Sequence, residues 1–116
     1  MDSLVSDLLT DNQLAALEEI KDRINKKFNL ENIILYGSVV RGELDEESDI
    51  DLLIITEKDH PREVRHQITD IVFEVNLKYE TNYSTLVVDV DSWEVGPYSV
   101  LPIQAEIEKE GVAYVQ

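Results

Sequence analysis

Two short apolar segments, residues 33–36 and 52–56, most constrain what this chain can fold into. Apolar runs of this length, bounded by turn residues, are typical of strands buried in a sheet. The first is followed by a glycine-serine turn at 37–38, and the second comes directly after Asp49 and Asp51 with one isoleucine between them. Side chains two positions apart on a strand face the same side. We therefore expect the two carboxylates to project together from the start of the second strand.

The paired carboxylates favour a metal-nucleotide site. Two like charges at that spacing repel each other unless a cation lies between them. Mg²⁺ prefers carboxylate oxygens and usually carries substrate phosphates as well. Gly37 would let backbone N–H groups approach a phosphate closely, and Ser38 would add a hydroxyl. The Gly-x-x-x-x-Gly-Lys-Ser/Thr pattern of a P-loop is absent, which excludes that alternative.

Two motifs follow each other along the chain: Gly37-Ser38-x-x-Arg41-Gly42, and then Ser48-Asp49-x-Asp51-Leu52. Together they resemble the signature of minimal nucleotidyltransferase (MNT) domains of the DNA polymerase beta-like superfamily, and the resemblance covers most of the chain. It implies an enzyme that binds an NTP, with ATP as the expected substrate, through two Mg²⁺ ions. Such an enzyme transfers a nucleoside monophosphate to a hydroxyl and releases pyrophosphate.

The resemblance also assigns roles to residues of the two motifs. Arg41 either contacts phosphate or pins the acidic loop that follows it, and the resemblance favours phosphate. The residues expected to bind the nucleotide are Gly37, Ser38, Arg41 and Ser48. The residues expected to hold metal and to be catalytic are Asp49 and Asp51.

Polymerase-type chemistry needs a third carboxylate, and a third apolar segment at 85–91 offers two candidates. Asp89 and Asp91 alternate there with valines. An acid at the core edge of a strand is costly unless it is paired or bound to metal. Asp89, nearer the middle of the segment, is the first choice for a shared metal ligand and Asp91 the second. The alternative is that both face solvent.

The resemblance implies a dedicated protein partner. Many such small domains are encoded beside a helical HEPN-type protein and act as its antitoxin, some by adenylylating it. A chain of this size has little surface with which to choose an acceptor, which also favours a partner or a second copy, as a hetero- or homo-oligomer. Two alternatives stay open: an inactive binding module that masks the partner sterically, and a transferase acting on a small molecule.

The remaining pattern predicts an α/β fold. The sequence predicts a single polymerase beta palm-like domain over residues 1–116, with a mixed sheet of about four strands flanked by helices. The helical spacing of Leu14, Leu17, Ile20, Ile24 and Phe28 follows candidate caps at 10–12. Further helices are expected at 39–43, 62–79 and 99–109, with a polar loop at 44–48 and a last strand at 112–115.

Composition narrows the partners and the location. The 25 acidic residues against 10 basic ones give a net charge of −15, which disfavours nucleic-acid binding and suits a basic protein partner. There is no cysteine, no basic leader and no apolar run of membrane-spanning length, so a cytoplasmic location is expected. His60 and His66 do not suggest a zinc site. Trp93 and Tyr98 could stack on a nucleobase but are more typical of packing residues.

Overall fold

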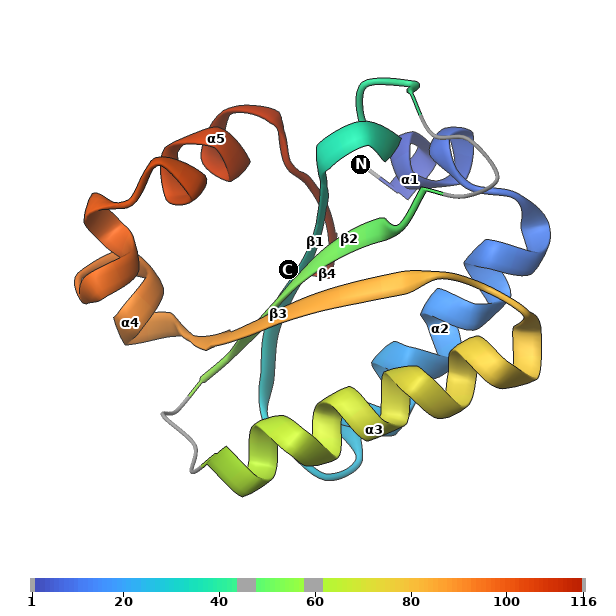
Figure 1. The fold of residues 1–116 in the computed structure, drawn as a ribbon, viewed down its shortest axis with the longest axis horizontal. Helices are drawn as coiled ribbons and strands as arrows, with labels where there is room; N and C mark the ends of the chain where they lie inside the picture. Colours follow the sequence, from blue (N-terminus) through green and yellow to red (C-terminus); the bar gives the residue numbers. More distant parts are fainter. Residues whose placement is uncertain (1, 44–47, 58–61, 116) are drawn as a thin grey trace.

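A four-stranded mixed sheet forms the centre of the molecule in the computed structural model, which describes residues 2–43, 48–57 and 62–115 (Figure 1). The strands lie in the order β3-β2-β1-β4; β1 is antiparallel to both of its neighbours, and β2 is parallel to β3. The strands are β1 (Leu30–Tyr36), β2 (Ile50–Thr56), β3 (Tyr83–Asp89) and β4 (Val112–Val115). The inner strand β2 is buried from Leu52 to Thr56, as its continuous apolar run predicts.

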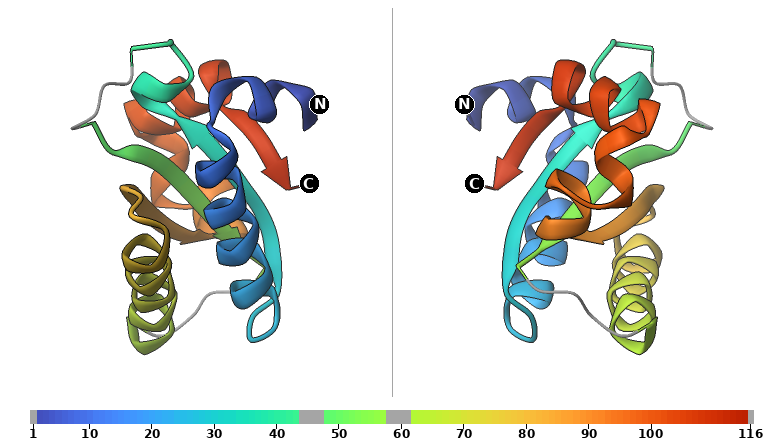
Figure 2. Two further views of the ribbon diagram at one scale, coloured as in Figure 1. Left: turned by 90° about the vertical axis from the view of Figure 1, so that its right-hand side faces the viewer. Right: turned by 90° about the vertical axis from the view of Figure 1, so that its left-hand side faces the viewer.

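Helices cover both faces of this sheet. In Figure 2, α2 lies in front of the sheet in one view, and α4 and α5 lie in front of it in the opposite view. The α-helices are α1 (Asp2–Leu8), α2 (Asp11–Asn25), α3 (Arg62–Tyr79), α4 (Val90–Glu94) and α5 (Pro102–Glu110). Two 3-10 turns are η1 (Gly37–Val39) and η2 (Pro97–Val100). The prediction of an α/β sheet flanked by helices is confirmed.

The alternation of side chains along the strands divides the core in two. On one face, Ile33, Leu35, Leu52 and Ile54 pack with the apolar stripes of α2 and α3. On the other face, the buried residues are Leu53, Ile55, Val88, Trp93 and Ile107. Trp93 is 3% exposed, and its ring lies 6.1 Å from that of Tyr98. The tryptophan is therefore a packing residue in this structure.

The helix termini show why some boundaries were predictable. Thr10 caps α2 through a reciprocal capping box: its hydroxyl accepts from the Gln13 N–H, and the Gln13 side chain accepts from the Thr10 N–H. α5 was expected from residue 99 with the proline inside its first turn, but it begins at Pro102, which has no N–H to leave unsatisfied there. None of the helices among the described residues is long and apolar enough to cross a membrane.

Other elements also differ from the sequence prediction: β1 begins at Leu30 and not at residue 33, and β3 begins at Tyr83 and not at residue 85. The third strand was expected to reach residue 91, but it ends at Asp89 because this side chain caps the short helix α4. A helix was expected to begin within 39–43, but the only helical turn that the described residues form there is the 3-10 turn η1, which ends at Val39. α1 was not predicted. The expected loop at 44–48 lies, apart from Ser48, outside the described residues, and so does His60.

Candidate active site

The end of β1 and the start of β2 bring the glycine-serine turn against the acid pair. Tyr36, the last residue of β1, is the cross-strand neighbour of Asp51. Gly37 follows with φ +80°, a conformation that favours glycine. A Cβ at this position would lie 2.5 Å from Asp51 Oδ2. The Asp51 carboxylate therefore occupies the space that any other residue at position 37 would fill.

The electrostatics of the pair are unfavourable without a cation. Asp49 is exposed and Asp51 is half-buried. Burial and the charge of Asp49 raise the pKa of the Asp51 carboxyl, against a smaller opposing effect of Arg41. The pKa of Tyr36 is raised by its burial and by the charges of Asp51 and Glu106. Two close carboxylates of which one is partly desolvated are a donor set that fits Mg²⁺.

The turn after β1 is held by backbone hydrogen bonds of its own. The Ser38 carbonyl accepts hydrogen bonds from the N–H groups of Arg41 and Glu43, at 3.2 and 3.0 Å. This tight turn holds Ser38 one residue beyond the glycine that contacts Asp51. Ser48 lies directly before Asp49 and is half-buried. The predicted motif residues Gly37, Ser38, Asp49 and Asp51 are thus brought together by the pairing of β1 with β2.

Arg41 forms ion pairs with carboxylates in this structure. Its guanidinium lies 3.0 Å from Glu43 and 3.3 Å from Glu110 of α5. These carboxylates raise the pKa of Arg41. Because the side chains are substantially exposed, solvent screens these pairs and they contribute little to stability. Arg41 can therefore exchange them for a phosphate at little cost.

Asp89 is not brought to the acid pair. In the parallel register, Asp51 lies opposite Ser84, whereas Asp89 lies opposite Thr56 at the other end of the strands. Five residues of strand correspond to about 16 Å. The residue on β3 that shares the face of Asp51 beyond Ser84 is Leu86, which is apolar. Among residues 2–43, 48–57 and 62–115, no three acidic or histidine side chains are grouped to hold a metal ion.

The Asp89 carboxylate instead has a structural role. The Ser92 backbone N–H donates to Asp89 Oδ2 at 2.9 Å, while Oδ1 is buried without a partner among the described residues. Burial alone would raise the pKa of Asp89, but the hydrogen bonds to Ser92 and the charge of Arg65 hold it below its ordinary value. The second candidate, Asp91, is exposed on α4. The prediction for the third carboxylate therefore needs correction: neither aspartate lies beside Asp51.

A pocket of about 400 Å³ opens beside Asp49. It lies between α3 and the beginning of β3, so residues distant in sequence meet there. Its other lining residues are Thr69, Val72, Phe73, Asn76, Asn82, Tyr83, Ser84 and Thr85. The sequence analysis did not single out the α3 residues. The signal available was polar Asn76, one turn after Val72 on the apolar side of the helix.

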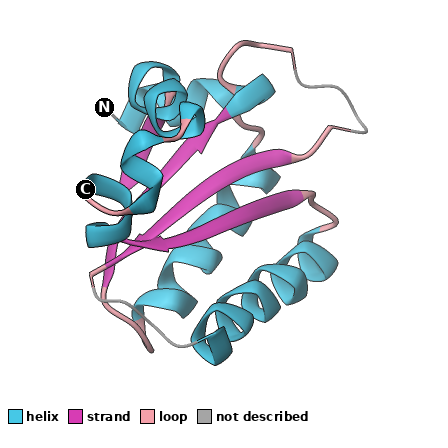
Figure 3. Ribbon diagram, turned by 60° about the vertical axis from the view of Figure 1, so that its left-hand side comes forward, coloured by secondary structure: helices cyan, strands magenta, loops and turns pink. Residues whose placement is uncertain are grey.

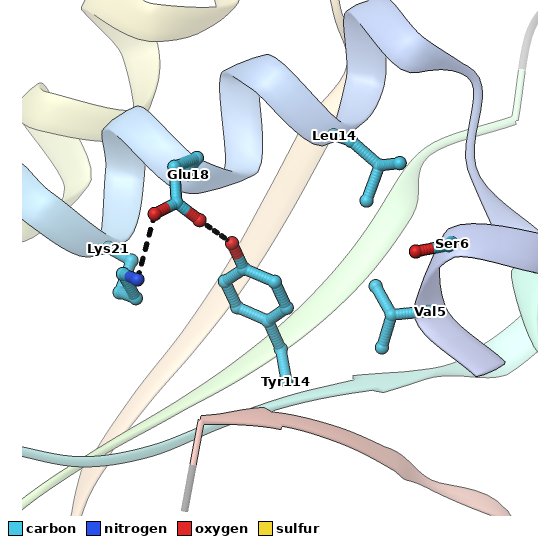
Figure 4. A pocket seen from close by; sticks show the side chains of 6 residues that line it. All are labelled: Val5, Ser6, Leu14, Glu18, Lys21 and Tyr114. Carbon is cyan, nitrogen blue, oxygen red and sulfur yellow. Dashed lines mark hydrogen bonds and ion pairs between the residues drawn. The ribbon is translucent and has the colours of Figure 1, made fainter. Parts of the chain in front are cut away.

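A second pocket, of about 320 Å³, lies away from the predicted site residues. It is formed by α1, α2 and β4, and Val5 and Leu14 form its apolar wall (Figure 4). Glu18 accepts hydrogen bonds from Lys21 and from the hydroxyl of Tyr114. Its carboxylate is already satisfied within the protein, so this pocket offers no unpaired charge to a nucleotide.

This chain is similar in sequence to curated proteins. Two proteins of Methanocaldococcus jannaschii, MJ0141 and MJ1305, each bear the name "Putative protein adenylyltransferase". The chain is 34% identical to MJ0141 over 73 residues, which cover 61% of this chain and 74% of that protein. It is 39% identical to MJ1305 over 77 residues, which cover 63% of this chain and 52% of that protein.

Solved structures share the fold. A crystal structure of a toxin-antitoxin with AMP-PNP matches 90% of this chain and 73% of its own, with a TM-score of 0.59 and 13% identity. A mutant of the toxin-antitoxin MntA-HpeT matches 91% of this chain and 73% of its own, with a TM-score of 0.55 and 17% identity. The family model described as nucleotidyltransferase domain matches residues 17–114. These residues contain both motifs, strands β1 to β3 and all but the last residue of β4, and the chain therefore belongs to the nucleotidyltransferase domain family.

Proposed function

We propose that this chain transfers AMP from ATP to a hydroxyl of a partner protein, using Mg²⁺ held by Asp49 and Asp51. The observation that carries the proposal is the contact between Gly37 and Asp51. It sets the turn that would bind phosphate directly against the Asp51 carboxylate. The nearby charge of Asp49 repels this carboxylate, and a bound cation would relieve that repulsion. A turn in which glycine, serine and acid pair meet suits a metal-bound triphosphate better than a solvated strand end.

Each residue of the turn has a defined task in this proposal. Bound Mg²⁺ would neutralise charge on the triphosphate and on the leaving pyrophosphate. Gly37 keeps side-chain atoms away from the phosphates, and Ser38 and Ser48 supply hydroxyl donors. Arg41 leaves its exposed carboxylate partners for a phosphate oxygen. The acceptor oxygen forms a bond to the α-phosphorus as the bond to the pyrophosphate oxygen breaks, and the hydroxyl proton passes to solvent.

The proposed acceptor is a HEPN-type helical protein encoded nearby, which the chain would neutralise as an antitoxin in the cytoplasm. The names of the M. jannaschii relatives support protein adenylylation. The toxin-antitoxin structures that share the fold support a partner of the toxin kind. The net charge of −15 favours a basic protein surface over nucleic acid. We propose two Mg²⁺ ions by analogy with the superfamily.

One observation favours a second candidate function. Ser84 and Leu86 lie on β3 at the positions where a third carboxylate would face Asp51. A site with two acids could bind a metal-nucleotide complex and turn over slowly or not at all. The chain would then act as a binding module that masks its partner sterically. The two candidates differ in whether the partner becomes covalently labelled.

Label transfer tests the proposal. The protein and the product of the adjacent gene are incubated with Mg²⁺ and with α-labelled or γ-labelled ATP. We expect the partner to take up label from the α-labelled nucleotide alone, and Asp51→Asn to abolish the transfer. Asp91→Asn is the matched control, because it removes an exposed acid far from the turn. Tight complex formation without label in the wild type would refute catalysis and leave the masking function.

A further inference from the structure

The outer edge of β3 pairs with no other strand among the described residues, and it lies beside the candidate site. β3 is the first strand in the sheet order, and Figure 3 shows α3 running alongside it. The Ile50 N–H donates to the Asn82 carbonyl at 2.8 Å, so even-numbered residues of β3 direct their backbone groups toward β2. The alternation along a parallel ladder turns the backbone groups of the odd-numbered residues outward. These are Tyr83, Thr85 and Val87.

One end of this edge is already closed. The Asn76 side chain donates to the Tyr83 carbonyl and accepts from the Tyr83 N–H, both at 3.0 Å. The next outward residues, Thr85 and Val87, have no such cap among the hydrogen bonds that join described residues. An edge with outward N–H and C=O groups is a template for an added strand. The open part of the edge therefore begins directly after the capped residue.

Apolar side chains of α3 lie along the same edge. Phe73 is 61% exposed and Leu77 is 67% exposed, one turn apart on the helix. The pocket that contains Asp49 is also lined by Phe73 and Thr85. A neighbouring pocket of about 460 Å³ shares Phe73 with it and extends to Leu77. The two pockets share Phe73 and Asn76 and form one groove, which extends from Asp49 and Thr85 along α3 to Leu77.

The charged residues that line this groove are acidic. Asp49 lies at one end of it, and Glu80 lines the pocket at the other. Asp70 precedes Phe73 by one helical turn on the same exposed side. Lys78, a nearby cation of α3, is held at 2.7 Å by Glu19 of α2. A segment that complements these acidic residues carries basic side chains.

We infer that this groove, between α3 and the outer edge of β3, binds an extended, basic segment of the acceptor protein and leads its hydroxyl to Asp49. The segment pairs with the backbone of Thr85 and Val87 and sets an apolar side chain against Phe73 and Leu77. The inference rests on the proposed function for the role of Asp49, but the docking itself needs no catalysis. An added strand would fix the register of the acceptor hydroxyl relative to the site.

A peptide titration tests the groove. The probe is a 12-residue peptide with a central tyrosine flanked by alternating valine and lysine, followed by amide NMR of the whole chain. We expect shifts at Thr85, Val87, Phe73 and Leu77, and slower hydrogen exchange of the two β3 amides. The same peptide with glutamate for lysine should bind at least about 10-fold more weakly. Absence of shifts at β3 at millimolar peptide, or shifts confined to α4 and α5, would overturn the inference.

Variants separate the groove from the proposed catalysis. Phe73→Asp and Thr85→Pro should each weaken peptide binding about 10- to 30-fold, the first by removing an anchor and the second by removing an outward N–H. Val95→Asp is the control, an exposed apolar residue on the opposite face. Docking without transfer of AMP to the tyrosine would support the groove and refute the proposed transfer to it. Transfer at wild-type rate by both groove variants would support catalysis and overturn the groove.

Discussion

Replacing Gly37 by alanine would separate two effects that meet at this position. The backbone there has φ +80°, and an L-residue with a side chain pays about 1–2 kcal/mol in this region. The new Cβ would also lie 2.5 Å from Asp51 Oδ2, where ordinary contact begins at 3.4 Å. The Asp51 carboxylate must therefore move by nearly the difference between these distances, or the turn must move instead. Metal coordination tolerates displacements of about 0.2 Å.

Gly42→Ala is the matched control for this change. Gly42 has φ +72°, but a Cβ there would meet no atom within 4 Å. Both variants should therefore lose about 1–2 kcal/mol, or about 4–10 °C in thermal midpoint for a chain of this size. Gly37→Ala alone should also weaken Mg²⁺-dependent ATP binding, by at least about 10-fold.

Calorimetric titration of ATP with and without Mg²⁺, together with thermal unfolding, measures both quantities. The reasoning fails if the two variants bind ATP equally well, because the contact between Gly37 and Asp51 would then have no part in the nucleotide site. It also fails if Gly37→Ala keeps the stability of the wild type, because the positive φ would then cost nothing.

Three further predictions concern the remaining site residues. Asp51→Asn should raise the thermal midpoint of the metal-free protein at pH 7 and abolish stabilisation by Mg²⁺, because burial and Asp49 raise the pKa of Asp51 and its ionised form opposes folding. The pKa of Asp51 is higher in the folded than in the unfolded state, so the free energy of unfolding of the wild type should fall as pH rises through the interval between these two pKa values. Urea melts measure this fall at each pH. The same fall in the Asp51→Asn variant would contradict the prediction. Asp89→Ala should cost about 1 kcal/mol by removing the helix cap on Ser92 and leave ATP binding unchanged; loss of Mg²⁺-dependent binding in calorimetry would restore Asp89 as a ligand. The pKa of Asp89 is lowered in the folded state, so its contribution to the free energy of unfolding should be lost as pH falls through that pKa, measured in the same urea melts. Arg41→Ala should leave the thermal midpoint close to that of the wild type, because its ion pairs are exposed, but weaken ATP binding about 10-fold in the same titration. Unchanged affinity would assign Arg41 to its carboxylate partners.

The parts of the fold that depend on the order of apolar and polar residues within one short segment could be predicted from the sequence. The unbroken apolar run of β2 predicted an inner strand, and the Thr10 cap predicted the start of α2. α4 was missed because Val88 to Asp91 alternates with the period of a strand. The structure ends the strand there because the Asp89 side chain satisfies the Ser92 N–H. A side-chain hydrogen bond of this kind leaves no trace in the periodicity.

The acid pair could be predicted, but the third carboxylate could not. Asp49 and Asp51 lie on one strand, where spacing alone fixes their common direction. The position of Asp89 depends on the register between β2 and β3, which are joined through a whole helix. Nothing in the alternation of β3 tells whether Ser84 or Asp89 lies beside Asp51. The pairing of Arg41 with Glu110 has the same origin, because α5 is far away in sequence.

The pairing of β1 on both sides has a consequence for synthesis on the ribosome. β2 follows β1 after one loop, whereas β4 is the last strand to appear. The turn at Gly37 can therefore fold against Asp51 while the other edge of β1 still has no neighbour. Until residues 112–115 emerge, a nascent chain carries the paired strands β1 and β2 with one edge of β1 open. A translational arrest before this point should release a product that chaperones bind and that aggregates readily.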